Sequence, residues 1–419
     1  MSAEVSTQRH ENAAEGSKRP GTSRLVAARL LLVLLAVMVP LATLEVAFRV
    51  AGPFIPGNYD TGSYLTRDAR YGHHHPANYS GWIKRDEYVV QIQTNAERQR
   101  GPAVPFERTP GTLRILVLGD SFVEAAQVAE HERFIARLQE LLNAAGGPTH
   151  YEVVDGGCGG WGAVQQLLYL QEEGPRYKPD LVLLAFFTGN DVVNNSYELE
   201  LEGNVNAALK PYFEPRSGGQ LALLEPDPPP PSFGEQVGFF LRERSALYNV
   251  VESGVLQKLS LDDLWAHWRD LDARVELTIR EAEVYATQLD PRWRAAWAMT
   301  DTLLGRIGVE ASSQGARFGL VIVPTRAQVL PDAWRALTGS AEGRDRAFDP
   351  MQPNNLLAGI AGRTSTPLLD LTPTFREVGR GRGAVPLYFA RDQHWTAAGH
   401  DLAARTMVDW LKGSGLIPG

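Results

Sequence analysis

The most chemically suggestive segment of the chain is Arg114–Phe122, where a run of branched apolar residues ends in Gly119, Asp120 and Ser121. The apolar run lacks alternation, which predicts a buried parallel strand. Gly119 permits a tight turn, and Ser121 then lies where open α/β sheets place their ligands. A serine at such a place can act as a nucleophile when a base and an oxyanion site are close by. The alternative is an ordinary turn in which Asp120 or Ser121 caps the next helix.

Three further segments offer the groups that a serine nucleophile needs. Residues 153–162 follow another apolar strand and contain five glycines, whose bare backbone can approach a ligand closely. Residues 181–191 form a third apolar strand that ends beside Asn190, a side-chain amide donor. Near the C-terminus, Asp392 and His394 are two residues apart, so that they point the same way in an extended turn. An acid and a base that follow the serine in the chain are compatible with a Ser-His-Asp triad.

Together these segments resemble, in order, the four motif blocks of the SGNH (GDSL-like) hydrolase superfamily. The resemblance implies that Ser121 is the nucleophile, that His394 is the base and that Asp392 is the acid. It also implies an oxyanion hole made by the backbone N–H groups of Ser121 and Gly160 and by the side chain of Asn190. Each block alone is a weak signal, whereas four blocks in register and in order form a strong one.

Two departures from the family pattern stand out. Asp155 replaces the usual Asn, and we expect it to have a structural role. One residue separates Asp392 from His394, where many members have two. The Asp-x-His-Trp-Thr form is similar to that of membrane-associated members, including those linked to polysaccharide O-acetylation.

The resemblance implies an α/β fold of three layers, flavodoxin-like, with a central and mostly parallel sheet. We place this domain at residues 111–419, with a helical insertion at about 194–290 that either covers the site or forms a packing subdomain. The insertion is expected to begin with a polar loop and to turn helical from Phe233 onward. Further strands are expected at residues 318–324 and 366–371.

The N-terminal region carries a second strong signal. Residues 1–24 are polar and predict a disordered cytoplasmic tail. Residues 30–44 are an uncharged run, shorter than the roughly 20 residues of a membrane span, and residues 25–51 together predict a transmembrane anchor that Glu45 interrupts near its end. Basic residues before the run favour a cytoplasmic N-terminus and an exported remainder. The alternatives are a cleaved signal peptide and a buried helix of the globular domain.

Residues 52–110 read as a lead-in segment that packs on the domain, with one strand at residues 87–94. His73–His75 predict a solvated loop rather than a metal site, because three consecutive histidines do not easily face one ion. Cys158, the single cysteine, is expected to be a small filler residue, and His400 a surface residue. The net charge of −8 gives no indication of nucleic-acid binding.

These observations predict an extracytoplasmic serine esterase, membrane-anchored, that hydrolyses acyl esters, acetyl esters above all. The alternatives are an O-acyltransferase acting on a cell-envelope polysaccharide and a non-catalytic envelope protein that keeps the fold. The expected partners are an acylated carbohydrate or small ester and the membrane. The resemblance implies neither a metal nor an organic cofactor.

Overall fold

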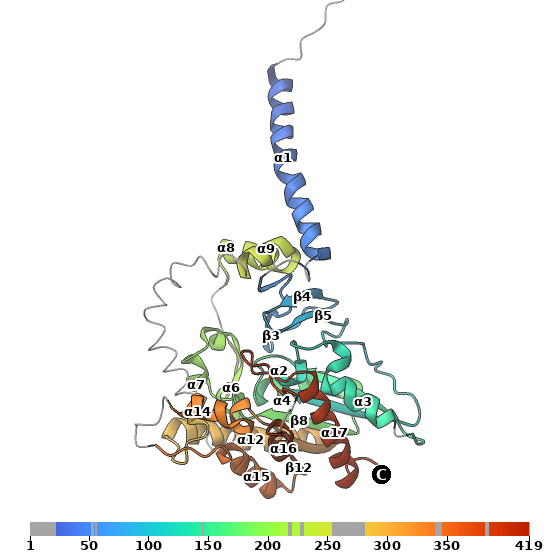
Figure 1. Cartoon of the computed structure of the whole chain (residues 1–419), viewed down its shortest axis with the longest axis vertical. Coiled ribbons are helices and arrows are strands. Elements are labelled where there is room, and N and C mark those ends of the chain that lie inside the picture. The colour runs from blue at the N-terminus through green and yellow to red at the C-terminus, as the bar shows by residue number, and fades with distance from the viewer. Residues whose placement is uncertain are drawn as a thin grey trace, which may run out of the picture.

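A five-stranded parallel sheet lies at the centre of the globular part (Figure 1). Its strand order is β12-β11-β8-β6-β7. The strands are β6 (Thr112–Gly119), β7 (His150–Gly157), β8 (Leu181–Phe187), β11 (Arg317–Val323) and β12 (Leu368–Asp370). The computed structural model describes residues 22–51, 54, 57–144, 146–216, 220–226, 230–253, 281–339, 346–381 and 385–418.

Helices cover both faces of this sheet, because its strands are apolar on both sides. Ile115 and Val117 of β6 belong to the cluster that packs with α3 (Phe134–Ala144), α16 (Thr372–Gly379) and α17 (Ala397–Gly413). Leu116 and Leu118 point the other way, toward the cluster formed with α4 (Ala163–Glu172), α12 (Pro291–Ser313) and α15 (Gln352–Thr364). The predicted three-layer α/β fold is therefore confirmed.

The strand order places a topological switch point at β6. The chain passes from β6 to β7 on one side and then returns to β8 on the other, and both neighbours are parallel to β6. In such sheets the crevice at the carboxyl ends of the two diverging strands is the preferred ligand site. Ser121 follows β6 and Asn190 follows β8, so both residues lie at this crevice.

The lead-in segment forms two small antiparallel sheets beside the main domain. One contains β1 (Tyr59–Asp60), β4 (Ser80–Lys84) and β5 (Val89–Gln93), in the order β1-β4-β5. The other is the hairpin of β2 (Thr66–Asp68) and β3 (Gly72–His74). The strand predicted at residues 87–94 is confirmed as β5, which pairs with β4.

Between β8 and β11 the chain forms several short elements. They include the hairpin of β9 and β10, which the sequence did not reveal because its strands are only four residues long. The helices expected from Phe233 onward are present as α8 and α9, and residues 254–280, which carry the centre of the expected insertion, lie outside the described residues. In chain order the elements are α6 (Asp191–Asn194), α7 (Tyr197–Leu201), η3 (Val205–Leu209), β9 (Tyr212–Pro215), β10 (Leu221–Leu224), α8 (Phe233–Arg244) and α9 (Ala246–Val251). The remaining short helices are α2 (Ser121–Glu124), η2 (Glu130–Glu132), α5 (Gly174–Tyr177), α13 (Arg326–Val329) and α14 (Pro331–Gly339).

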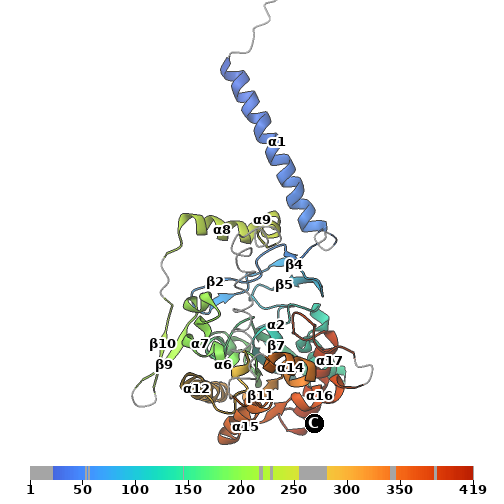
Figure 2. The same ribbon diagram turned by 60° about the vertical axis from the view of Figure 1, so that its left-hand side comes forward.

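The long helix α1 (Thr22–Ala51) projects away from the globular part (Figures 1 and 2). Within its segment Ser23–Val50, the most apolar stretch of 18 residues has a mean hydropathy of 2.6 and is not buried by the rest of the protein. Its length and composition suit a membrane anchor or a signal sequence. Its exposure excludes the alternative of a buried core helix. The expected disordered tail falls almost entirely on residues outside the described part of the chain.

Candidate active site

Ser121 occupies the sharp turn between β6 and α2. Asp120 is the N-cap of α2, and its Oδ1 accepts the backbone N–H of Phe122 over 2.9 Å. A Cβ atom at Gly119 would lie 2.3 Å from a methyl carbon of Val123, so only glycine fits at the end of β6. The capping interpretation of Asp120 is therefore correct, and the cap holds Ser121 at the first position of the helix.

His394 connects Ser121 to Asp392. Its Nε2 lies 2.8 Å from Oγ of Ser121, and its Nδ1 lies 2.7 Å from Oδ1 of Asp392. Gln393 between them adopts a φ of +70°, which turns the chain so that both neighbours face the serine. The three predicted triad residues, 273 positions apart at the widest, thus form one hydrogen-bonded chain.

The environment tunes both titratable members of this chain. Burial lowers the pKa of His394, but the hydrogen bond to Asp392 and the charge of Asp392 raise it by more. The pKa of His394 therefore lies above its usual value. Burial raises the pKa of Asp392, but the hydrogen bonds from His394 and Tyr88 outweigh it and leave a lowered pKa. A charged Asp392 beside a readily protonated imidazole is the electrostatic arrangement that a general base requires.

The lead-in segment holds the acid of this chain, a role that the sequence did not reveal. The Tyr88 hydroxyl donates to Oδ2 of Asp392 over 2.8 Å. The Glu87 carboxylate accepts the backbone N–H groups of Ala390, Arg391 and Asp392 at 2.7, 3.0 and 2.9 Å. The position of Tyr88 within the predicted strand was the available signal, but the partner loop lies about 300 residues away in the chain and could not be inferred.

The glycine-rich loop after β7 passes beside Ser121. A Cβ atom at Gly159 would lie 3.8 Å from Cβ of Ser121. Gly160 has a φ of +74°, a conformation that favours glycine. Asp155 stays on the strand, where it accepts the N–H of Gly157 over 2.9 Å and a hydrogen bond from the buried Arg133, in keeping with its expected structural role.

Asn190 lines the same cavity as Ser121 and His394, which has a volume of about 470 Å³. Its side chain hydrogen-bonds the Asp120 carboxylate, and its Oδ1 is buried without a hydrogen-bond partner among the described residues. The pKa of Asp120 is raised to about 6, chiefly by burial. Burial and the neighbouring Asp120 also raise the pKa of Asp191. The structure thus places Asn190 in the same cavity as Ser121. Asp392 is the carboxylate that hydrogen-bonds His394.

Two predictions about histidines are wrong. His73–His75 do not form a solvated loop: His74 and His75 are buried, and His73 contacts the carbonyl of Gly159. His400 is buried too, because α17 packs against α3; its Nδ1 accepts the N–H of Phe134 over 3.3 Å.

His74, His75 and Cys158 place potential ligand atoms within 4.8 Å of one another. The imidazole of His75, however, is already engaged by Glu124 at 2.6 Å and by the carbonyl of Arg98 at 3.1 Å. His74 accepts the N–H of His75 through its Nδ1. The donor atoms therefore serve the packing of the loop, and we assign no metal to this cluster. Cys158 is fully buried, as expected for a filler residue.

Comparison with known proteins bears on this geometry. Residues 283–417 match the family described as "SGNH hydrolase-like domain, acetyltransferase AlgX". The matched region contains Asp392 and His394, while Ser121 lies before it. No curated protein matches the chain by sequence.

Several solved structures are similar to parts of the chain. The acetylxylan esterase Axe2 of Geobacillus stearothermophilus is 15% identical over 72% of this chain and 94% of the other, with a TM-score of 0.37. A lipase/acylhydrolase from Enterococcus faecalis is 12% identical over 72% of this chain and 96% of the other, with a TM-score of 0.36. The family match over residues 283–417 and the four sequence motifs, rather than these low TM-scores, identify this part of the chain as an SGNH hydrolase-like domain of the ester hydrolase or acyltransferase type.

Proposed function

We propose that the chain is an extracytoplasmic enzyme that forms an acyl-serine at Ser121 and releases the acyl group, an acetyl group above all, to water. The observation that carries this proposal is the hydrogen-bonded chain from Ser121 through His394 to Asp392 at the switch point of the sheet. Nucleophile, base and orienting acid stand in the order that acyl transfer requires.

The proposed reaction has two halves. Oγ of Ser121 attacks the ester carbonyl while Nε2 of His394 takes its proton, and the protonated imidazole then gives this proton to the leaving alkoxide. Asp392 orients His394 and stabilises its imidazolium. In the second half, an incoming hydroxyl attacks the acyl-serine, His394 takes its proton, and Oγ of Ser121 leaves and regains a proton from His394. We assign the oxyanion to the N–H groups of Ser121 and Gly160 and to the amide of Asn190.

A second candidate is transfer of the acyl group to a cell-envelope polysaccharide. The match of residues 283–417 to an acetyltransferase domain favours it. Both reactions share the acyl-serine and differ in whether water or a sugar hydroxyl arrives next. The anchor helix α1 suits either, since we propose that it holds the enzyme on the outer face of the membrane, with the N-terminus in the cytoplasm.

The test uses the full chain in detergent with p-nitrophenyl acetate as donor, with and without oligosaccharide acceptors, and the Ser121→Ala variant as control. Release of free acetate that acceptors do not change supports hydrolysis. Appearance of an O-acetylated oligosaccharide at the expense of free acetate supports transfer. Equal rates in the wild type and in Ser121→Ala contradict both.

A further inference from the structure

Helix α8 lies at the edge of the globular part from which α1 rises (Figures 1 and 2). The two helices are joined through the N-terminus of α9. The carboxylate of Glu45 in α1 accepts the hydroxyl of Ser245 at 2.8 Å and the backbone N–H of Ala246 at 2.9 Å and of Leu247 at 3.0 Å. Glu45, which interrupts the apolar run, is thus the acceptor that caps α9, a stabilising place for a carboxylate.

This contact sets the height of α8 relative to a bilayer. A helix rises about 1.5 Å per residue, so about 20 residues cross the roughly 30 Å of hydrocarbon. Residues 25–44 supply that length, with the long side chain of Arg29 able to reach the headgroups at one end, and Glu45 follows at once at the other. Ser245, directly after α8, therefore lies at the level where hydrocarbon gives way to headgroups.

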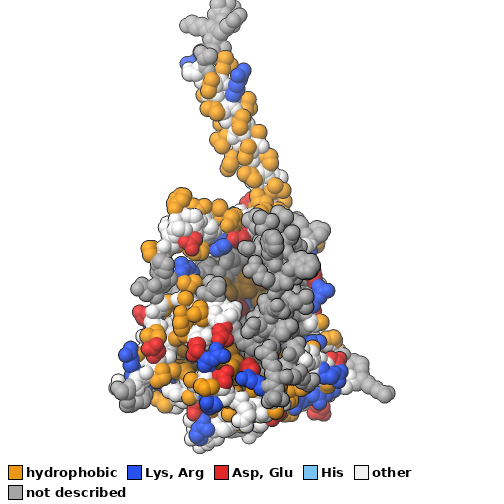
Figure 3. All heavy atoms as spheres, turned by 90° about the vertical axis from the view of Figure 1, so that its left-hand side faces the viewer, with side chains coloured by type: hydrophobic (Ala, Val, Ile, Leu, Met, Phe, Trp, Pro, Cys, Tyr) orange, Lys and Arg blue, Asp and Glu red, His pale blue; other side chains and the backbone are white. Residues whose placement is uncertain are grey.

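One face of α8 presents apolar side chains to the outside. Phe233, Val237 and Phe240 are spaced four and three residues apart, which places them on one stripe of the helix. Their exposed fractions are 82%, 41% and 54%, and Figure 3 shows apolar side chains gathered at the end of the globular part nearest α1. Arg244 extends the same stripe, with its guanidinium 4.7 Å from the centre of the Phe240 ring. An apolar stripe with a basic end is typical of helices that lie in a membrane interface.

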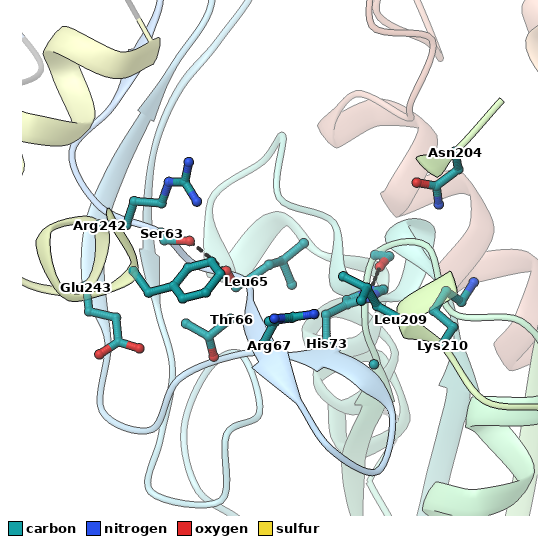
Figure 4. Close-up of a pocket in the computed structure, with 13 residues that line it drawn as sticks. Ser63, Leu65, Thr66, Arg67, His73, Asn204, Leu209, Lys210, Arg242 and Glu243 are labelled. Carbon is teal, nitrogen blue, oxygen red and sulfur yellow. Dashed lines mark hydrogen bonds between the residues drawn. The ribbon is translucent and has the colours of Figure 1, made fainter. Parts of the chain in front are cut away.

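The opposite face of α8 is turned toward the lead-in segment across a cavity. Phe239, Arg242 and Glu243 line a cavity of about 460 Å³ together with Arg67 of β2 and His73 of β3 (Figure 4). The guanidinium of Arg67 lies 5.7 Å from the centre of the Phe239 ring. This face of α8 therefore borders the cavity on the domain side, and the stripe of Phe233, Val237 and Phe240 lies on the other side of the helix.

We propose that this outer stripe of α8 rests in the headgroup region of the lipid bilayer that α1 enters. The proposal rests on the proposed membrane anchoring. Because α1 crosses the bilayer and α8 lies along its surface, the catalytic domain is held in a single orientation and does not rotate freely about α1.

The test places nitroxide spin labels on the full chain in bilayer nanodiscs of phosphatidylethanolamine and phosphatidylglycerol. Single variants Phe233→Cys, Val237→Cys and Phe240→Cys are compared with Glu235→Cys, on the opposite side of α8, and with Glu243→Cys, which lines the cavity. The native Cys158 is fully buried, and the unsubstituted chain controls for its labelling. Leu34→Cys in α1 reports the anchor separately.

Power saturation with oxygen and with a water-soluble nickel chelate measures depth. We expect the labels at the three stripe positions to be more accessible to oxygen than to the nickel chelate, and the labels at the two comparison positions to be more accessible to the nickel chelate. Nickel access at the stripe while Leu34→Cys stays immersed would overturn the docking of α8 and leave the anchor intact. Exclusion of both reagents from the stripe would also overturn it, since a protein partner then covers α8. Nickel access at Leu34→Cys would overturn the anchor itself.

A different observation supports a second inference about the oxyanion loop. Nε2 of His73 lies 2.7 Å from the carbonyl oxygen of Gly159 (Figure 4). The carbonyl only accepts, so Nε2 carries the proton, and burial lowers the pKa of His73, which keeps its ring neutral. Nζ of Lys210 donates to the next carbonyl, that of Gly160, over 2.8 Å. Both peptide planes of this loop are therefore fixed by side chains.

The geometry points to His73 as a positioning residue for the proposed oxyanion donor. In a planar trans peptide the N–H points opposite to the C=O. Holding the carbonyl of Gly159 therefore directs the N–H of Gly160 away from His73, and the bond also polarises that N–H. Histidine is required here as a donor and makes no contact with the reacting atoms.

Kinetics of His73→Ala and His73→Gln with an activated acetyl ester test this role. We expect kcat of His73→Ala to fall about tenfold with KM little changed, because an oxyanion donor acts on the transition state, and His73→Gln to recover part of the loss. An unchanged kcat per folded molecule in His73→Ala would overturn the inference. If the wild type itself did not hydrolyse the ester, that result would instead contradict the proposed function.

Discussion

Tyr88 and Asp392 are 304 positions apart in the chain, yet the hydroxyl of Tyr88 donates a 2.8 Å hydrogen bond to Oδ2 of Asp392. The lead-in segment is thus part of the site and not merely a connection between the anchor and the main domain. The turn between β4 and β5, which contains Tyr88, also contributes Glu87, whose carboxylate holds the backbone of the loop that carries Asp392.

Removal of the Tyr88 hydroxyl tests this coupling. A hydrogen bond to a charged group contributes about 1.5–3 kcal/mol, so Tyr88→Phe is expected to lower kcat about tenfold with little change in KM. Tyr79→Phe is the matched control, because the Tyr79 hydroxyl has no hydrogen-bond partner among the described residues. Equal kcat values in the two variants would show that Tyr88 does not support the acid.

Glu87 is expected to order the loop rather than to take part in chemistry. In Glu87→Ala, three backbone N–H groups lose their acceptor, so amide hydrogen exchange at residues 390–392 should accelerate and kcat should fall. Asp86→Ala is the control, since Asp86 makes an exposed ion pair with Arg391 and such pairs contribute little. Unchanged exchange in Glu87→Ala contradicts this role.

Asn190 is expected to act on the developing oxyanion. Loss of one such donor costs about 10²–10³ in kcat, so Asn190→Ala should show a loss of that order while KM and the unfolding temperature change little. Asn194→Ala removes another amide whose Oδ1 is buried without a hydrogen-bond partner among the described residues, and Asn194 does not line the cavity of Ser121. If kcat of Asn190→Ala matches that of Asn194→Ala, Asn190 only shapes the turn.

The pH profile reports the state of His394. The neutral imidazole is the base, so kcat/KM must fall as the pH drops through its pKa. Because Asp392 raises that pKa, the midpoint is expected above the ordinary value of about 6.5. In Asp392→Asn the raising charge is gone and burial remains, so the midpoint should move to lower pH and the plateau should fall by about 10²–10⁴. A midpoint that stays in place would assign the titration to another group.

The central sheet and the triad could be predicted because their signals are local. The strands β6, β8 and β11 each contain a continuous apolar run, and Ser121, Asn190 and His394 each follow a recognisable turn. The capping role of Asp120 could be predicted in the same way, because it follows from the place of this residue directly before a helix.

The supporting contacts could not be predicted, because they join segments that are distant in the chain. The polarity of His73 and His400 suggested exposure, whereas tertiary packing buries His400 against Phe134 and pairs His73 with Gly159. In the sequence Glu45 only interrupts an apolar run, whereas in the structure it accepts hydrogen bonds from the N-terminus of α9. A buried polar residue is visible in a sequence only together with its partner.

The most direct test of the account is a trapped acyl-enzyme. The full chain is mixed with p-nitrophenyl acetate, quenched in acid within the first turnover, digested and analysed by mass spectrometry, beside Ser121→Ala. The account predicts an acetyl group on the peptide that contains Ser121. In His394→Ala, which releases the acetyl group more slowly, the stoichiometry should approach one acetyl group per chain with this activated ester. No acetyl group at Ser121 in either background, with turnover that persists in Ser121→Ala, would contradict it.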